Sequence, residues 1–259
     1  MAQHLVAWSE DFDSATLGRI KVVQDDVLTQ DGEDRFFIPQ EYRYIRWGAA
    51  LGEDLTRGQI VTPSLQVRRN NLEVMPRNAD QETFSLFSPQ VMVPPRPIEL
   101  RVNEQIEFQV AEDGSGATQC IGLVSLGPAE LPPMPAGEIR VSRATGTTTL
   151  TARTWSTVTL TLDSSLEPGR YSIVGFYATG ATVIAARLLI TGQVFRPGLP
   201  GLIGAFDAAS DFDPTIFDKL MFYNMGEFTQ VNLPQMQFLA TAADTAQAVV
   251  LYIIRIGDQ

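Results

Sequence analysis

Polar and apolar residues alternate with a period of two in several short stretches of the chain. Ile106, Phe108 and Val110 are apolar, and the residues between them are polar. Successive side chains of a strand point to opposite faces of a sheet, so this pattern predicts a strand with one buried and one solvated face. Residues 157–162 alternate in the same way, and their threonines suit a pleated surface.

Other stretches are apolar at nearly every position. Such runs predict strands that are covered on both faces. They are residues 121–126, 171–178, 183–190 and 249–256.

Turn-forming residues separate these stretches. The loop 112–116 is rich in Gly and acidic residues, and Gly180 interrupts a long apolar run, so both positions predict hairpins. Pro168 followed by Gly169 suits the centre of a type II turn. Four prolines in residues 128–137 cannot donate to a ladder and predict an extended surface loop.

Helical signals are few. Asp213 followed by Pro214 predicts an N-cap and the first turn of a helix that continues to Met221. Short helical turns are also expected at residues 14–17 and 240–248. Strand content is therefore expected to be far above helix content.

The element pattern predicts an all-β fold. Many short strands with Gly and Pro turns, and no alternation of strand with helix, indicate a jelly-roll-type antiparallel β-sandwich with minor short helices. One elaborated sandwich or two packed ones both fit 259 residues. Prolines at 94–97 suggest a boundary between an N-terminal β region, residues 1–93, and a β-sandwich, residues 98–259.

An internal repeat is not evident in the sequence. Arg57 and Arg187 can be aligned with flanking apolar residues, but only isolated identities result, so the sequence does not indicate a duplication.

Composition removes most catalytic chemistry. His4 is the only histidine and Cys120 the only cysteine. These counts exclude a disulfide framework, a cysteine-based zinc site and a three-histidine metal site, and they disfavour a Ser-His-Asp triad. Cys120 has no basic neighbour in sequence, so a buried structural thiol is expected, and His4 is expected to be an ordinary polar residue of the first strand. We expect no enzymatic activity.

Paired acids are the only chemical feature present in quantity. Asp211 and Asp213 have the Asp-x-Asp spacing of calcium loops but lack the glycine and distal glutamate of an EF-hand. Helix capping in a solvated loop is the alternative interpretation. A glycosidase needs two carboxylates facing each other across a cleft, and no such pair stands out. No cofactor is therefore predicted, with calcium left open.

The charge balance disfavours nucleic acid as a direct partner. The chain has 30 acidic and 19 basic residues and a net charge of -11, whereas a nucleic-acid binder carries a basic patch or arm. Arg68 and Arg69 have no further basic residue beside them, and residues 1–20 hold one arginine and no lysine. Seventeen of the basic residues are arginines, which suit bidentate ion pairs at interfaces, although a GC-rich genome gives the same bias.

No export or transmembrane segment is expected. Residues 1–10 lack the basic start and the apolar run of a signal peptide. Residues 173–190 are the most apolar stretch, but they contain Arg187 and two glycines, so two buried strands are favoured over a membrane helix.

Aromatic residues cluster at Tyr42, Tyr44 and Trp47, with Arg43 and Arg46 between them. Such a cluster could be a stacking platform for sugar or single-stranded nucleic acid. Packing in the core or at an interface is favoured, because large aromatic side chains dominate both.

Three stretches carry a resemblance to a known family: residues 42–65 (YRYIRWGAALGEDLTRGQIVTPSL), 166–198 (LEPGRYSIVGFYATGATVIAARLLITGQVFRPG) and 225–256 (MGEFTQVNLPQMQFLATAADTAQAVVLYIIRI). Together they resemble jelly-roll coat proteins of tailless icosahedral DNA phages and archaeal viruses. The resemblance is one of pattern, covers about half the chain and brings no catalytic residue with it. The missing basic arm is compatible with a shell around a membrane or an inner protein layer.

The predicted function is a self-assembling structural protein, most simply a viral capsid subunit. Its partners would be other copies in a homo-oligomeric shell, together with other virion proteins. Its location would be the virion, assembled in the host cytoplasm, or otherwise the cytoplasm. The alternative is a non-catalytic glycan-binding or adhesin-type module that uses Tyr42, Tyr44 or Trp155.

Interface candidates come from the segment 201–227, which is irregular yet rich in large apolar residues. Burial of one such side chain contributes about 1.5–3 kcal/mol, so this segment is expected to pack against its own sandwich or a neighbouring subunit. Its acidic residues would remain at the rim and meet arginines. The candidates are Phe206, Phe212, Phe217, Arg140, Arg143 and Arg196.

Overall fold

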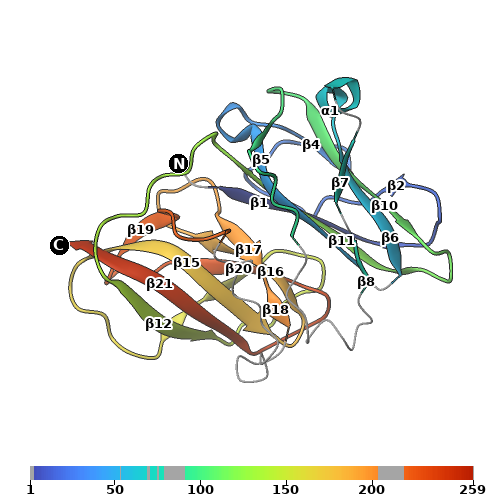
Figure 1. Ribbon diagram of the computed structural model, residues 1–259. Coiled ribbons are helices and arrows are strands. Elements are labelled where there is room, and N and C mark those ends of the chain that lie inside the picture. Colours follow the sequence, from blue (N-terminus) through green and yellow to red (C-terminus); the bar gives the residue numbers. More distant parts are fainter. Residues whose placement is uncertain are drawn as a thin grey trace. The chain divides into compact units, whose positions relative to one another are not determined.

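The chain forms two compact units, each built from two β-sheets (Figure 1). The computed structural model describes residues 3–52, 54–68, 71–74, 76–78, 91–203 and 219–258. The first unit is His4–Ala129, named the N-roll, and the second is Glu130–Gln259 with Met1–Gln3, named the C-roll. Strands make up most of the regular structure, which confirms the all-β prediction.

The described residues of the N-roll contain two short helices and a succession of mostly short strands. Its helices are η1 (Gln40–Tyr42) and α1 (Pro63–Arg68). Its strands are β1 (His4–Phe12), β2 (Gly18–Arg19), β3 (Gln30–Asp31), β4 (Arg35–Phe37), β5 (Tyr44–Gly52), β6 (Leu55–Val61), β7 (Leu72–Val74), β8 (Pro76–Asn78), β9 (Ile98–Glu99), β10 (Gln105–Glu112) and β11 (Thr118–Gly127).

Every regular element in the described residues of the C-roll is a strand. The strands are β12 (Ile139–Gly146), β13 (Ser156–Thr159), β14 (Thr161–Leu162), β15 (Arg170–Gly180), β16 (Val183–Leu189), β17 (Gly198–Pro200), β18 (Leu202–Ile203), β19 (Gly226–Thr229), β20 (Gln235–Ala240) and β21 (Gln247–Gly257).

The N-roll has the strand order of a jelly roll. One sheet runs β1-β11-β5-β8, with β9 also on β5, and the other runs β3-β4-β10-β6-β7, with β2 on β10. Counting β2–β4 as the second of eight positions and β8–β9 as the sixth, the sheets read 1-8-3-6 and 2-7-4-5. Strands from the start, middle and end of the unit therefore alternate, as in two interlocked Greek keys.

The C-roll repeats this order. Its first sheet, named the β21 sheet, runs β14-β12-β21-β15-β18, with β19 also on β15, and its second runs β13-β20-β16-β17. With β12 as the first position and β18–β19 as the sixth, the main strands again read 1-8-3-6 and 2-7-4-5. The structure thus contains two jelly rolls, which decides between the one sandwich and the two that the sequence left open.

The two rolls also correspond in register. Strand β6 begins at Leu55 and β16 at Val183, 128 positions later, and both have seven residues. Gln59 lies opposite Gln109, and Arg187 lies opposite Gln237, again shifted by 128 positions. The match of Arg57 with Arg187 that the sequence suggests therefore joins equivalent strands but is two residues out of register.

The domain boundary differs from the one that the prolines suggested. Residues 94–97 precede β9, which pairs with β5, and the following strands β10 and β11 pair with β6, β5 and β1. All of these strands belong to the N-roll, so the units divide between Ala129 and Glu130 instead. The prolines at 94–97 therefore lie in a loop within the N-roll and do not mark a domain boundary. Local turn residues misplaced the boundary because the strands that pair with one another are far apart in the sequence.

Both predicted hairpins are wrong. The loop 112–116 joins β10 to β11, and Gly180 lies at the join of β15 and β16, yet in each case the two strands belong to different sheets. The chain crosses between the layers at these loops and pairs with distant strands. The short helical turns expected at residues 14–17 and 240–248 are bends and coil instead.

Helix α1 was not predicted, although its start carries a signal. The Oγ1 atom of Thr62 accepts a hydrogen bond from the backbone N–H of Leu65 at 3.2 Å, and Pro63 takes the first helical position. The helix expected from Asp213 lies outside the described residues up to residue 218, and residues 219–220 form a turn.

Candidate assembly surfaces

His4 and Cys120 have the most reactive side chains, and both are buried in the core of the N-roll. His4 is fully buried on β1, and its Nε2 lies 3.0 Å from Oδ2 of the buried Asp25. It therefore lies on the first strand, as the sequence predicts, and it is buried and paired with a carboxylate. Cys120 is buried as predicted, and its Sγ lies 2.9 Å from Oε1 of Glu112. Burial, followed by this hydrogen bond, raises the pKa of the thiol, which keeps Cys120 neutral and poorly nucleophilic.

The outer face of β10 carries a hydrogen-bonded network. The Nε2 of Gln59 donates to Oε1 of Gln109 at 2.7 Å, and the Nε2 of Gln109 donates to Oε1 of Glu107 at 2.5 Å. The Nε of Arg19 lies 2.5 Å from Oε2 of Glu107. Glu107 is thus paired with the Arg19 guanidinium, whose Nη1 also lies 3.4 Å from Oδ2 of Asp34. Among the described residues, no group of three or more His, Cys, Asp or Glu side chains could hold a metal ion.

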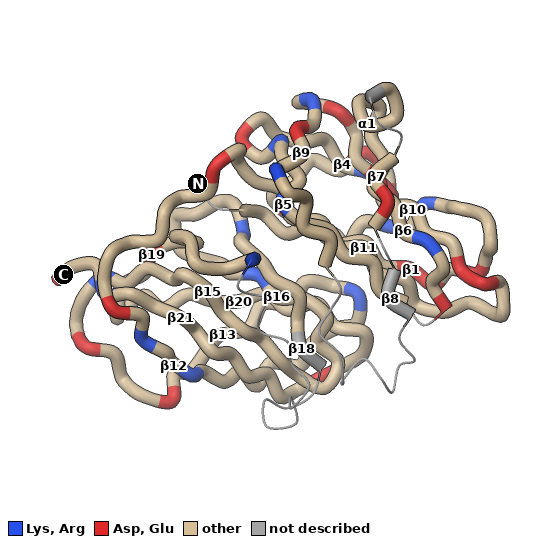
Figure 2. Tube along the Cα trace, viewed as in Figure 1, with Lys and Arg blue, Asp and Glu red and all other residues tan. Residues whose placement is uncertain are grey.

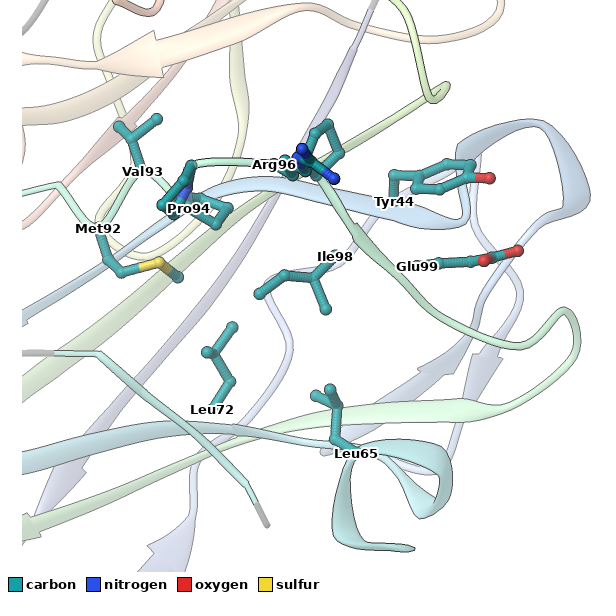
Figure 3. Close-up of a pocket in the computed structure, with 11 residues that line it drawn as sticks. Tyr44, Leu65, Leu72, Met92, Val93, Pro94, Arg96, Ile98 and Glu99 are labelled. Carbon is teal, nitrogen blue, oxygen red and sulfur yellow. The ribbon is translucent and has the colours of Figure 1, made fainter. Parts of the chain in front are cut away.

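An open groove of about 750 Å³ lies between the α1–β7 region and the segment that leads into β9. Leu72, Met92 and Ile98 point toward its middle in Figure 3, while Tyr44 and Glu99 lie at one end. Its lining is mainly aliphatic and proline-rich, so its chemistry suits an apolar group rather than proton transfer.

The tyrosines and tryptophan of residues 42–47 do not form an exposed platform. Tyr42 and Trp47 are 2% and 1% exposed, and burial raises the pKa of the Tyr42 hydroxyl. Tyr44 is half-buried, with the guanidinium of Arg43 5.5 Å from its ring centre. The packing interpretation therefore holds for Tyr42 and Trp47.

A second aromatic residue named for glycan binding, Trp155, covers a buried arginine of the C-roll. The guanidinium carbon of Arg187 lies 4.1 Å from the Trp155 ring centre, and Arg187 is fully buried. Arg187 and Arg196 both donate to Oε1 of Gln237, at 2.8 and 2.7 Å. Arg196, an interface candidate, is thus only 6% exposed and is held by a hydrogen bond to Gln237 of its own roll.

Arg140 and Arg143, the other arginine candidates, are exposed on β12. The Nη1 of Arg140 lies 3.5 Å from Oε2 of Glu167, and Arg143 forms no ion pair with another described residue. Beside them, Ile139 and Val141 are also exposed. Blue segments mark the basic residues of this strand in Figure 2.

The aromatic candidates Phe206, Phe212 and Phe217 lie outside the described residues, as do Asp211 and Asp213. The described end of the same segment packs on its own roll, because Leu220, Met221, Tyr223 and Met225 are buried. A Cβ atom at Gly175 of β15 would come within 2.7 Å of the Met221 sulfur, so this segment lies directly against the outer face of the β21 sheet.

Phe222 is exposed within this otherwise buried segment. It has φ +66°, in the left-handed region that bulky side chains avoid, and it is 37% exposed. Its ring packs edge-on against Tyr252 of β21, with centres 6.2 Å apart. The sequence does not single out Phe222 as the exposed residue, because residues 220–223 are all apolar and their pattern does not show which of them faces outward.

No described helix is long and apolar enough to cross a membrane. No protein-family model and no curated protein matches the sequence.

Among solved structures, the chain is similar to the major capsid protein P2 from bacteriophage PM2, at 9% identity and TM-score 0.23 over 98% of each chain. It is also similar to the STIV MCP, at 9% identity and TM-score 0.27, over 96% of this chain and 97% of that one. A Macrobrachium rosenbergii nodavirus structure aligns at 12% identity and TM-score 0.19, over 98% and 90%. A phage capsid protein is thus among the structural neighbours, as the resemblance implied. TM-scores of 0.19 to 0.27 are too low to serve as an argument for function.

Proposed function

We propose that this chain is a non-catalytic structural subunit that assembles with copies of itself into a shell, most simply a viral capsid. The observation that carries the proposal is the tandem of two jelly rolls with the same strand order and a common register. Jelly rolls of this order recur in capsid subunits, where their sheets form the walls of a shell.

The charge of the chain limits what the shell would touch. With a net charge of -11, the subunit would repel a packaged nucleic acid unless another layer lay between them. Other virion proteins are therefore the expected inner partners, and the virion is the expected location. Of the three residues named for the glycan-binding alternative, Tyr42 is buried, Tyr44 is half-buried and Trp155 stacks on Arg187, so these aromatic side chains do not form an exposed platform.

Assembly of the purified chain tests this proposal. Mass photometry and negative-stain electron microscopy should show particles or oligomers of many copies as the protein concentration rises. Ionic strength and calcium concentration should be varied in the same experiment. A strictly monomeric chain at high concentration under every condition would refute the proposal.

A further inference from the structure

The outer face of the β21 sheet in the C-roll carries an apolar patch with a basic edge. Strands β12, β21 and β15 lie side by side in it (Figure 1). Val141 of β12 lies opposite Tyr252 of β21, and Arg143 lies opposite Val250. Phe222 packs on Tyr252 from above the sheet. We define the β21 patch by these residues: Ile139, Val141, Arg143, Phe222, Val250 and Tyr252.

Burial along β21 shows that this face is open in part, since Ile254 on the same face is fully buried. Val249, Leu251 and Ile253 are buried in the roll, whereas Val250 and Tyr252, on the opposite face, are only partly covered. Residues 249–256 were predicted to be covered on both faces, and the structure differs here. Val141, on the neighbouring strand β12, is 59% exposed.

The backbone at Phe222 gives an independent reason to assign a role to this patch. A phenylalanine with φ +66° costs free energy that a glycine at the same position would avoid. The surrounding contacts hold it there: the Phe222 N–H donates to the Val174 carbonyl at 2.7 Å, and the Met225 N–H donates to the Ile173 carbonyl at 2.9 Å. Strain of this kind is retained mainly at functional sites.

We infer that the β21 patch is a contact surface between copies of this chain, and that it docks on an acidic surface of the neighbouring copy. This inference rests on the proposed function. Charge complementarity selects the partner, because the patch has Arg143 exposed and Arg140 at its margin, while the chain as a whole is strongly acidic. The N-roll supplies most of the excess, with 19 acidic and 11 basic residues in positions 4–129.

The same charges select the type of contact. If two copies met patch against patch, both surfaces would carry an exposed Arg143 and neither would supply a carboxylate, and like charges at an interface are unfavourable. The contact is therefore heterologous, with the patch of one copy on a different surface of the next. Contacts of this type close into rings or propagate, which is what a shell subunit requires.

A pair of matched variants tests the patch. Val141→Glu places a carboxylate on it, whereas Val231→Glu makes the same change at a valine of the C-roll that is 76% exposed and lies outside the patch. Both should remain folded by circular dichroism. Val141→Glu should raise the concentration for half-assembly, measured by mass photometry, about tenfold or more, while Val231→Glu should leave it near wild type.

Two further variants separate docking from folding. Phe222→Gly should leave the thermal midpoint unchanged or higher, because the strain is relieved, and should still weaken assembly. Arg143→Glu should weaken assembly, and the wild type should assemble less well as salt rises.

The results of these assembly measurements separate a failure of the β21 patch from a failure of the proposed function. If the wild type assembles and Val141→Glu assembles as Val231→Glu does, the patch is not a contact and the shell proposal stands. If Arg143→Glu strengthens assembly, the partner surface is not acidic and the inference fails. If the wild type never assembles, the proposed function itself is refuted.

Discussion

Substitution of Gly146 tests how the two sheets of the C-roll pack. Gly146 ends β12 in the β21 sheet, and Val158 is a fully buried residue of β13 in the opposite sheet. A Cβ atom at residue 146 would lie 2.3 Å from Cγ1 of Val158 and 3.2 Å from Oε1 of Gln247. Carbon atoms in contact prefer about 3.5–4.0 Å, so Gly146→Ala forces the two strands apart by roughly 1 Å or more.

The magnitude follows from this overlap. Overpacking a well-packed core costs about 1–3 kcal/mol, and an overlap this deep falls at the upper end, near 3 kcal/mol. Val158→Ala alone removes two methyl groups at about 0.8 kcal/mol each and leaves a small cavity, for a loss of about 2 kcal/mol. In the double variant the new methyl occupies the vacated space. It should therefore be no less stable than Val158→Ala, which gives a coupling energy of about 3 kcal/mol.

Urea denaturation with peptide-resolved hydrogen exchange measures this effect in the C-roll separately from the N-roll. The resolution by peptide matters because two units need not unfold in one transition. Gly257→Ala is the matched control, since a Cβ atom there meets no atom within 4 Å. Equal stability of Gly146→Ala and Gly257→Ala, or additive effects in the double variant, would refute this packing of the sheets.

Three further predictions concern buried polar groups. Because burial raises its pKa, Cys120 should resist iodoacetamide at pH 8 in the native protein and react in urea; native labelling as fast as in urea would contradict this. Trp155→Ala should lower the stability of the C-roll by about 2 kcal/mol, because it uncovers the Arg187 guanidinium; a loss of glycan-array binding at unchanged stability would instead favour the glycan alternative. Asp25→Ala should lower the stability of the N-roll by about 1–3 kcal/mol in urea denaturation, because it removes the acceptor that faces His4. Asp25→Asn should lower it by less, since the amide oxygen can still accept a hydrogen bond from His4. Equal losses in the two variants would show that this hydrogen bond contributes little.

Local pattern was sufficient to find five of the longer strands, but it did not identify β12. The alternation at Ile106, Phe108 and Val110 corresponds to β10, and the apolar runs correspond to β11, β15, β16 and β21. These patterns depend only on which neighbours in the sequence share a face, so no knowledge of partners is needed. The stretch 157–162 is the partial exception, since it is divided between β13 and β14.

Partners could not be read from the sequence. The glycine-rich loop 112–116 has the composition of a hairpin, but turn chemistry does not show whether the next strand pairs with its predecessor or crosses to the other sheet. β11 lies between β1 and β5, more than 60 residues away at the nearest pairs. The domain boundary was misplaced for the same reason.

The candidate surface was predicted only in part. Arg140 and Arg143 are exposed on β12, but Val250 and Tyr252 belong to a run in which every residue before Arg255 is apolar, so the sequence does not show which face is open. The left-handed backbone at Phe222 is also invisible to sequence analysis, because phenylalanine is a residue that normally avoids it.

Equivalent positions of the two rolls carry different outward-facing residues. At equivalent positions, the N-roll pairs Gln59 with Gln109, whereas the C-roll pairs Arg187 with Gln237. Each pair lies on the outer face of its sheet, while the inward positions next to them remain apolar in both rolls, for example Phe108 and Met236. At these positions core packing accounts for the apolar character of the inward side chains, while the outward pairs differ between the rolls. The two rolls therefore share a strand framework and a register but present different polar pairs on the outer faces of equivalent strands.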